Sequence, residues 1–293
     1  MKAADGSAAR LARESSIEVS CLEADDIRAG CDFLPPGQKV YVSHLPRQTW
    51  AETRNTCEQV TAAGFDPVPH LPVRLLTSES QLDEILPALR KAGAAELLLI
   101  SGDYARPLGP YSEVLDVMRT RKLQLHGFTR ISIAGHPEGH PGVEPAEIRR
   151  AQIAKSAWGA AAGLQVTLVT QFFFEAPPFI EWARTLRQAG VGARIVAGLA
   201  GPASIRKLLG LAKRCGVGPS MRALSSRPGA VLKMLSDRTP DLLLEELSRK
   251  TQREPALLDG IHLYSFGGFL RTAAWLRQAA DSAREDVRAR GVC

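Results

Sequence analysis

The chain has 293 residues, 45% hydrophobic and 23% charged, a composition typical of a soluble globular protein with one large domain or two small ones. No stretch approaches the roughly 20 apolar residues of a membrane span, and the N-terminal residues lack the apolar segment of a signal peptide. The net charge of +6 is dispersed without a basic run, which argues against nucleic-acid binding and is compatible with small anionic ligands.

Five cysteines are scattered along the chain without CxxC spacing, which argues against a zinc framework or a disulfide scaffold. A reducing cytoplasm is therefore the expected location. Residues 1–15 are small and polar and predict a flexible N-terminal segment, and residues 16–293 contain no obvious linker and predict one domain.

Strand-like and helix-like segments alternate from residue 16 onward. Strands are predicted over 16–21, 39–44, 65–71, 96–101, 130–135, 164–171, 193–198 and 260–265. Helices are predicted over 48–63, 80–91, 111–125, 145–162, 178–189 and 270–290, with a helix and turn ending at 37 and mainly helix over 202–253. This alternation predicts an α/β protein with a single eight-stranded β/α (TIM) barrel. A doubly wound sheet is the competing fold, but its usual GxGxxG turn is absent.

Polar and titratable residues lie on or directly after the predicted strands. They are Glu18, His44, His70, Asp103, His136, Glu138, His140, Gln171 and Ser265. Because the carboxyl ends of all barrel strands meet at one mouth, these residues are expected to converge there. His44 or Ser265 alone is more readily explained as an ordinary polar residue where a loop begins. The whole set predicts a ligand or catalytic site.

General acid and base catalysis is the favoured chemistry for this set. Imidazole and carboxylate also suit zinc or iron. However, the first strand lacks the HxH pair expected of a metal-dependent hydrolase barrel, and Pro137 prevents His136 and His140 from sharing a helical face. No metal is therefore predicted, and no GxSxG motif indicates a serine nucleophile.

A flat ligand is indicated by two further segments. Gly102 would let a ring approach the backbone, and the carboxylate of Asp103 could accept a hydrogen bond from it. The aromatic run at 172–174 could supply apolar walls beside the amide of Gln171, although at least one of its phenylalanines is expected in the core.

Four segments, in this order and spacing, resemble the methylenetetrahydrofolate reductase family. They are PHL at 69–71, SGD at 101–103, HPEGHP at 136–141 and TQFFF at 170–174. The resemblance runs from about Ser16 to Trp275. It implies a cytoplasmic oxidoreductase of one-carbon metabolism, with FAD at the barrel mouth and NADH or NADPH and a tetrahydrofolate derivative using the flavin in turn.

The resemblance also implies roles for individual residues. Glu18 matches the acid that protonates the folate, and Asp103 matches the catalytic aspartate between flavin and pterin. Gln171 matches a glutamine that binds the pterin, and Arg271 is the nearest candidate for a substrate-binding arginine. The implied cofactor-binding positions are His70, Gly102, Asp103, Ala134, His136, His140 and Lys155.

Three positions depart from the family pattern. Ser101 stands where an arginine is usual, His136 where a tyrosine is usual, and Ile205 where an aromatic residue is expected. Alternative interpretations are a flavin-independent reductase of the same family, a folate- or pterin-dependent methyltransferase on a similar barrel, and a folate-binding protein without catalysis. The sequence leaves open the reaction direction, the choice between NADH and NADPH, and whether the protein is a homo-oligomer.

Overall fold

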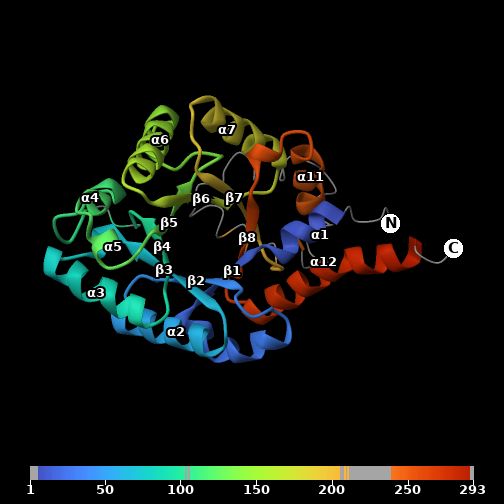
Figure 1. The fold of residues 1–293 in the computed structure, drawn as a ribbon, viewed down its shortest axis with the longest axis horizontal. Helices are drawn as coiled ribbons and strands as arrows, with labels where there is room; N and C mark the ends of the chain where they lie inside the picture. Colours follow the sequence, from blue (N-terminus) through green and yellow to red (C-terminus); the bar gives the residue numbers. More distant parts are fainter. Residues whose placement is uncertain are drawn as a thin grey trace.

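A computed structural model describes residues 6–102, 104, 106–204, 208, 210 and 239–290. Eight parallel strands form a closed barrel in the order β1 to β8, and helices surround it (Figure 1). The predicted TIM barrel is therefore confirmed.

The barrel strands lie close to the predicted segments. They are β1 (Ser16–Ser20), β2 (Lys39–Ser43), β3 (Asp66–Pro72), β4 (Glu96–Ile100), β5 (Arg130–Gly135), β6 (Gln165–Phe172), β7 (Arg194–Ala200) and β8 (Gly260–Tyr264). β8 pairs with β1 in parallel, which closes the sheet and removes its edges.

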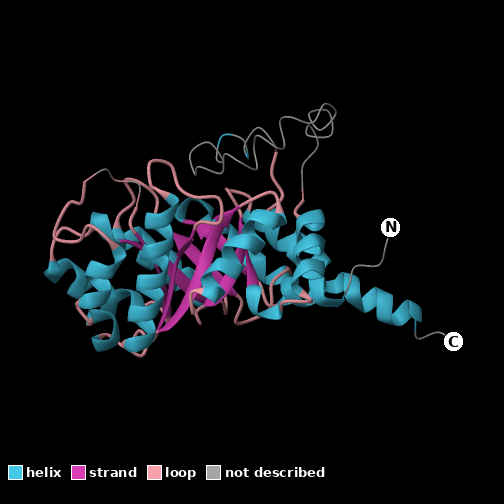
Figure 2. Ribbon diagram, turned by 90° about the horizontal axis from the view of Figure 1, so that it is seen from above, coloured by secondary structure: helices cyan, strands magenta, loops and turns pink. Residues whose placement is uncertain are grey.

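The main helices are α1 (Gly6–Arg13), α2 (Trp50–Ala62), α3 (Glu79–Lys91), α4 (Val114–Arg119), α5 (Lys122–Leu125), α6 (Pro145–Ala161), α7 (Ala176–Gln188), α11 (Asp241–Thr251) and α12 (Phe269–Arg290). Short 3-10 helices are η1 (Cys21–Asp26), η2 (Arg28–Asp32), η3 (Val73–Leu75) and η4 (Pro255–Leu257). Thr49 and Glu52 form a capping box that starts α2, and Ser78 caps α3. The end of α12 projects beyond the barrel (Figure 2). In the described part of the chain, none of the helices is both long and apolar enough to cross a membrane.

Alternate residues of each strand face the helices or the barrel interior. The outward set is mostly Ile, Val and Leu and joins the large core between barrel and helices. A separate cluster fills the interior with Tyr41, Val68, Leu98, Val169 and Val196. Because the side-chain period is two, Glu18 lies on the interior face with its register partner Tyr41.

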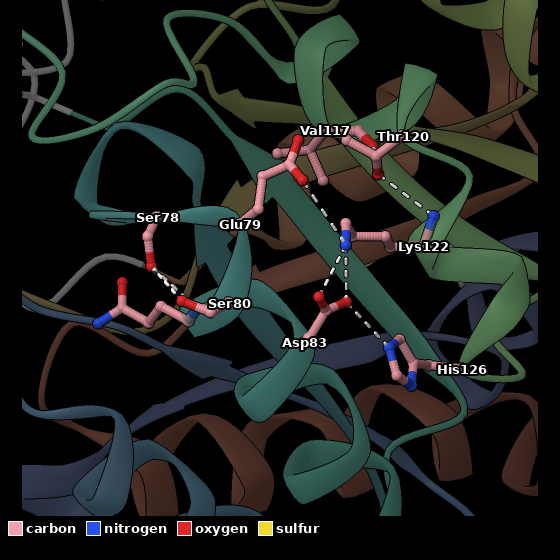
Figure 3. Close-up of polar contacts among 9 residues, drawn as sticks. Ser78, Glu79, Ser80, Asp83, Val117, Thr120, Lys122 and His126 are labelled. Atoms are coloured by element: carbon pink, nitrogen blue, oxygen red, sulfur yellow. Dashed lines mark hydrogen bonds and ion pairs between the residues drawn. The ribbon is translucent and has the colours of Figure 1, made fainter.

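The structure differs from the sequence prediction at residues 111–125, where one helix was expected. Two helices occur, because Arg121 adopts a left-handed conformation with φ of 59° between α4 and α5. Lys122 then reaches back to α3 and lies 2.7 Å from a carboxylate oxygen of Asp83, which also contacts His126 (Figure 3). This polar cluster connects α5 to α3.

The N-terminal segment also differs from the prediction of a flexible 1–15. Residues 6–13 form α1, which packs between α11 and α12, and Ala8, Leu11 and Ala12 are buried. Its small apolar residues recur at helical spacing, a signal that the polar composition masked. Of the mainly helical stretch predicted over 202–253, the structure describes α11, while residues 205–207, 209 and 211–238 lie outside the described part.

Candidate active site

Glu18 is the middle residue of β1 and lies in the barrel interior. One of its carboxylate oxygens is 3.5 Å from Nε2 of His70 and 4.0 Å from Nε2 of His262. Burial raises the pKa of Glu18 above its ordinary value, the nearby His70 opposes the rise, and Glu23 adds to it. A carboxyl group in this environment holds its proton to a higher pH than an exposed glutamate does.

His70 lies on β3 and is buried. Burial lowers its pKa to about 4, although Glu18 opposes that shift, so the ring is neutral near neutral pH. Its Nε2 atom has no hydrogen-bond partner within the described part of the protein. A buried ring nitrogen without a partner marks a position where a ligand atom would be stabilised.

His262 of β8 is a site residue that sequence reasoning missed. It is 1% exposed, its Nδ1 is hydrogen-bonded to the hydroxyl of Ser16 at 2.9 Å, and its ring packs 4.6 Å from that of Tyr41. Burial lowers its pKa to about 3. The alternation of the segment GIHLYS could have placed His262 on the inward face, but not next to Glu18, which is 244 positions earlier in the chain.

A second polar group gathers at the turn after β5. His136 Nδ1 lies 3.4 Å from the amide nitrogen of Gln152 on α6, whose amide oxygen accepts a hydrogen bond from Trp182 Nε1. Burial, with His140 and Lys155 nearby, lowers the pKa of His136 to about 3. His136 is therefore a neutral, positioned ring rather than a cation.

The HPEGHP turn is held by a residue from the next strand. The side-chain nitrogen of Gln171 donates a hydrogen bond to the carbonyl oxygen of Gly139 at 3.1 Å. The rings of His136 and His140 meet edge to face at 5.5 Å, and His140 is exposed. Gln171 and His140 therefore lie at the same turn as His136.

Lys155 of α6 is partly buried, and it lies close enough to His136 to help lower the pKa of that ring. Burial lowers the pKa of Lys155, while Glu113 opposes that shift. No ion pair of Lys155 occurs among the described residues. A partly desolvated cation without a close carboxylate is suited to an anionic ligand group.

The loop after β4 begins at Gly102, which has φ of 86° and whose Cβ position would lie 3.1 Å from Pro72. Only glycine adopts this conformation without strain. Arg74 braces the loop, because its backbone N–H donates to the carbonyl of Ser101 and its guanidinium donates to that of Tyr104. The predicted Asp103 lies outside the described residues, as does Ile205. Ala134 is partly buried on the inward face of β5.

The aromatic run is mainly structural. Phe172 and Phe173 are buried, and Phe173 stacks on Phe179. The expectation that at least one phenylalanine belongs to the core is confirmed. Phe172 also contacts Phe266, which together with Tyr264 forms an aromatic wall at the end of β8.

Two residues at the strand ends have structural partners. His44 is hydrogen-bonded to Thr53 at 2.7 Å and stacks on Trp50, so it belongs to the start of α2. Ser265 donates to a carboxylate oxygen of Glu23, which also accepts the N–H of Phe269. Glu23, another residue that sequence reasoning missed, thus caps α12.

Arg271 is exposed in the first turn of α12, where its guanidinium lies over Gly268. No group of three or more His, Cys, Asp or Glu side chains that could hold a metal occurs in the described part of the chain.

The residues around the mouth fit a flavin cofactor in two respects. Nε2 of His70, which makes no hydrogen bond to the described residues, and the positive-φ Gly102 suit a flat polar ring, and Lys155 beside neutral His136 suits a phosphate group.

Comparison with known proteins identifies a family. The model of the family described as methylenetetrahydrofolate reductase matches residues 47–221. Methylenetetrahydrofolate reductase (NADH) 1 of Arabidopsis thaliana is 24% identical over a 148-residue alignment that covers 46% of this chain and 25% of that protein. The matched part therefore spans about a quarter of this curated relative.

One solved structure shows the same fold. A protein described as a lyase/mutase from Burkholderia cenocepacia has a TM-score of 0.51 and 14% identity, with 98% of this chain and 94% of that chain covered. A dihydropteroate synthase from Thermus thermophilus has a TM-score of 0.47 and 13% identity, with 90% and 91% covered. The first of these likenesses shows the barrel fold alone.

Proposed function

The chain belongs to the methylenetetrahydrofolate reductase family, and from this premise we propose that it interconverts 5,10-methylenetetrahydrofolate and 5-methyltetrahydrofolate. The observation that carries the proposal is the carboxyl group of Glu18, which is largely buried in the barrel and lies 3.5 Å from Nε2 of His70, an atom that makes no hydrogen bond to the described residues. A general acid needs a raised pKa and a position within reach of the bound substrate.

In this proposal Glu18 donates its proton to a nitrogen of the folate, which opens the five-membered ring of 5,10-methylenetetrahydrofolate. His70 and His262, both neutral near neutral pH, keep the carboxyl in place without forming a permanent ion pair with it. In the opposite direction, the Glu18 carboxylate takes the proton back. The barrel wall keeps water away from the carboxyl, since the Glu18 side chain is only 16% exposed.

FAD is the proposed cofactor, and it would carry hydride between NADH or NADPH and the folate. His70, Gly102, Ala134, His136 and His140 would bind it, with Lys155 at a phosphate group. Gln171 is proposed to bind the pterin through its amide oxygen, because its nitrogen is engaged with Gly139. Arg271 and Asp103 are proposed as further substrate contacts.

The test begins with an absorbance spectrum of the purified protein, followed by anaerobic addition of 5-methyltetrahydrofolate. The expected result is a flavin band that bleaches when the folate is added. Glu18→Gln should bind FAD with unchanged affinity but lose turnover, whereas Glu58→Gln, on the exposed surface of α2, should behave like the parent protein.

Three outcomes would change the proposal. The protein could form 5-methyltetrahydrofolate from NADH but show no flavin band and no thermal stabilisation by added FAD. That result would support the reductase reaction and contradict FAD as its cofactor. Methyl transfer without nicotinamide oxidation would replace the reductase by a methyltransferase. Full activity of Glu18→Gln would show that the proton comes from another group.

A further inference from the structure

A cavity of about 430 Å³ opens at the end of the barrel where the strands begin. It lies between α6, the residues that follow α7, and the first residues of β2, β4, β5, β6 and β7. Catalytic sites of this fold lie at the opposite end, at the carboxyl ends of the strands. The proposed reductase chemistry therefore makes no use of this cavity.

One wall of the cavity is basic. Lys39, Arg130 and Arg194 line it, and Glu96 is the carboxylate that faces them. Lys39 is committed to Glu96 at 2.6 Å, whereas the nearest carboxylate to Arg130 is Glu96 at 4.0 Å. Arg194 donates to the backbone carbonyl of Asp259, and no carboxylate of the described residues lies within ion-pair distance of it. The wall thus holds more positive charge than Glu96 balances.

The opposite wall is apolar. It consists of Ile153, Ala157 and Ala160 on α6, together with Leu164 and Val191. Ala157 and Ala160 line the cavity and are exposed, although their side chains are apolar. A ligand that fills the cavity therefore needs an apolar body as well as a charged head.

A buried hydroxyl adds a polar group to this lining. Ser156 lines the cavity, is 5% exposed, and its hydroxyl has no hydrogen-bond partner in the part of the chain that the structure describes. A second cavity of about 280 Å³ shares Lys39, Thr167 and Arg194 with the first. Lys39 and Arg194 therefore lie where the two cavities meet, whereas Arg130 lines the first cavity only.

We propose that this cavity binds a small organic anion, with a carboxylate or phosphate head on an apolar body about the size of one ring. The head contacts Arg130 and Arg194, which are the cations least compensated by protein carboxylates. The body packs on Ala157 and Ala160. The site is separate from the catalytic mouth and does not depend on the reductase assignment.

The experiment measures binding of benzoate, phenyl phosphate and inorganic phosphate to the full-length protein by calorimetry at constant ionic strength. The expected result is saturable binding of one ring-bearing anion per chain, with inorganic phosphate at least tenfold weaker because it lacks the apolar body. Comparing benzoate with phenyl phosphate identifies the preferred head group.

Matched variants locate the site. Arg194→Gln should weaken binding about tenfold, and Ala157→Phe should abolish it by filling the apolar side. Ala154→Phe is the control, because Ala154 is exposed on the same helix and does not line the cavity. Absence of saturable binding by every probe would overturn the proposal. Affinities of Arg194→Gln and Ala157→Phe that equal the affinity of the parent protein would also overturn it, since the anions would then bind elsewhere.

Discussion

The carboxylate oxygen of Glu18 lies 3.5 Å from Nε2 of His70, in a part of the barrel interior where both side chains are largely buried. Burial acts on the two groups in opposite directions, because it raises the pKa of the acid and lowers that of the imidazole to about 4. The pair is consequently stable with Glu18 protonated and His70 neutral over a wider pH range than two exposed groups would be.

Glu18→Gln should reduce folate turnover by roughly 10²–10⁴-fold, the usual contribution of a general acid. The same change should raise the melting temperature at about pH 8. The folded-state pKa of Glu18 is raised, so its contribution to stability is present at low pH and is lost as pH rises through that pKa. Melting curves from about pH 4 to 8 test this, and a constant difference across that range would contradict the raised pKa.

The buried histidines should make the protein sensitive to acid. The pKa values of His70 and His262 are lowered to about 4 and about 3, whereas an unfolded histidine titrates near 6.5. The unfolded state therefore binds more protons below about pH 6.5, and stability falls as pH drops toward the folded values. His262→Asn should flatten this acid limb in melting experiments. An unchanged slope would show that His262 titrates normally in the folded protein.

Lys39→Met should destabilise the protein by about 3 kcal/mol, the lower end for breaking a buried ion pair, because Lys39 is 34% exposed. Its partner Glu96 is 3% exposed and would lose its closest cation. Urea denaturation measures the loss. The double variant Lys39→Met, Glu96→Gln should recover most of it, since the glutamine carries no charge and still accepts the hydrogen bond from Ser132. A lack of recovery would mean that Lys39 acts through packing.

Gly135→Ala should cost about 1–3 kcal/mol because its Cβ would lie 2.9 Å from the ring of Trp182 and 3.1 Å from Thr170. Movement of Trp182 would also disturb the hydrogen bond to Gln152, the neighbour of His136. FAD affinity should therefore fall together with stability. Gly192→Ala is the control, since nothing lies within 4 Å of its Cβ position. Equal denaturation midpoints for both variants would rule out this close contact.

Much of the barrel could be predicted from local patterns. The strand from Glu96 reads as a continuous apolar run because both faces of a barrel strand are buried, and α6 begins at a proline, as expected at a first helical turn. The break between α4 and α5 could not be read in the same way. It depends on the left-handed conformation of Arg121 and on the ion pair between the next residue, Lys122, and Asp83 on α3.

The sequence by itself determined the barrel, its family and the set of polar residues at the strand ends, because strand periodicity and short motifs are local properties of the chain. Only the tertiary structure divided that set and added His262 and Gln152 to it. It groups Glu18 and His70 with His262, places His136 beside Gln152, and gives His44 a structural role beside Thr53. The physical reason is closure of the barrel. Pairing of β8 with β1 brings His262 beside Glu18, and the same burial that joins them raises one pKa and lowers the other.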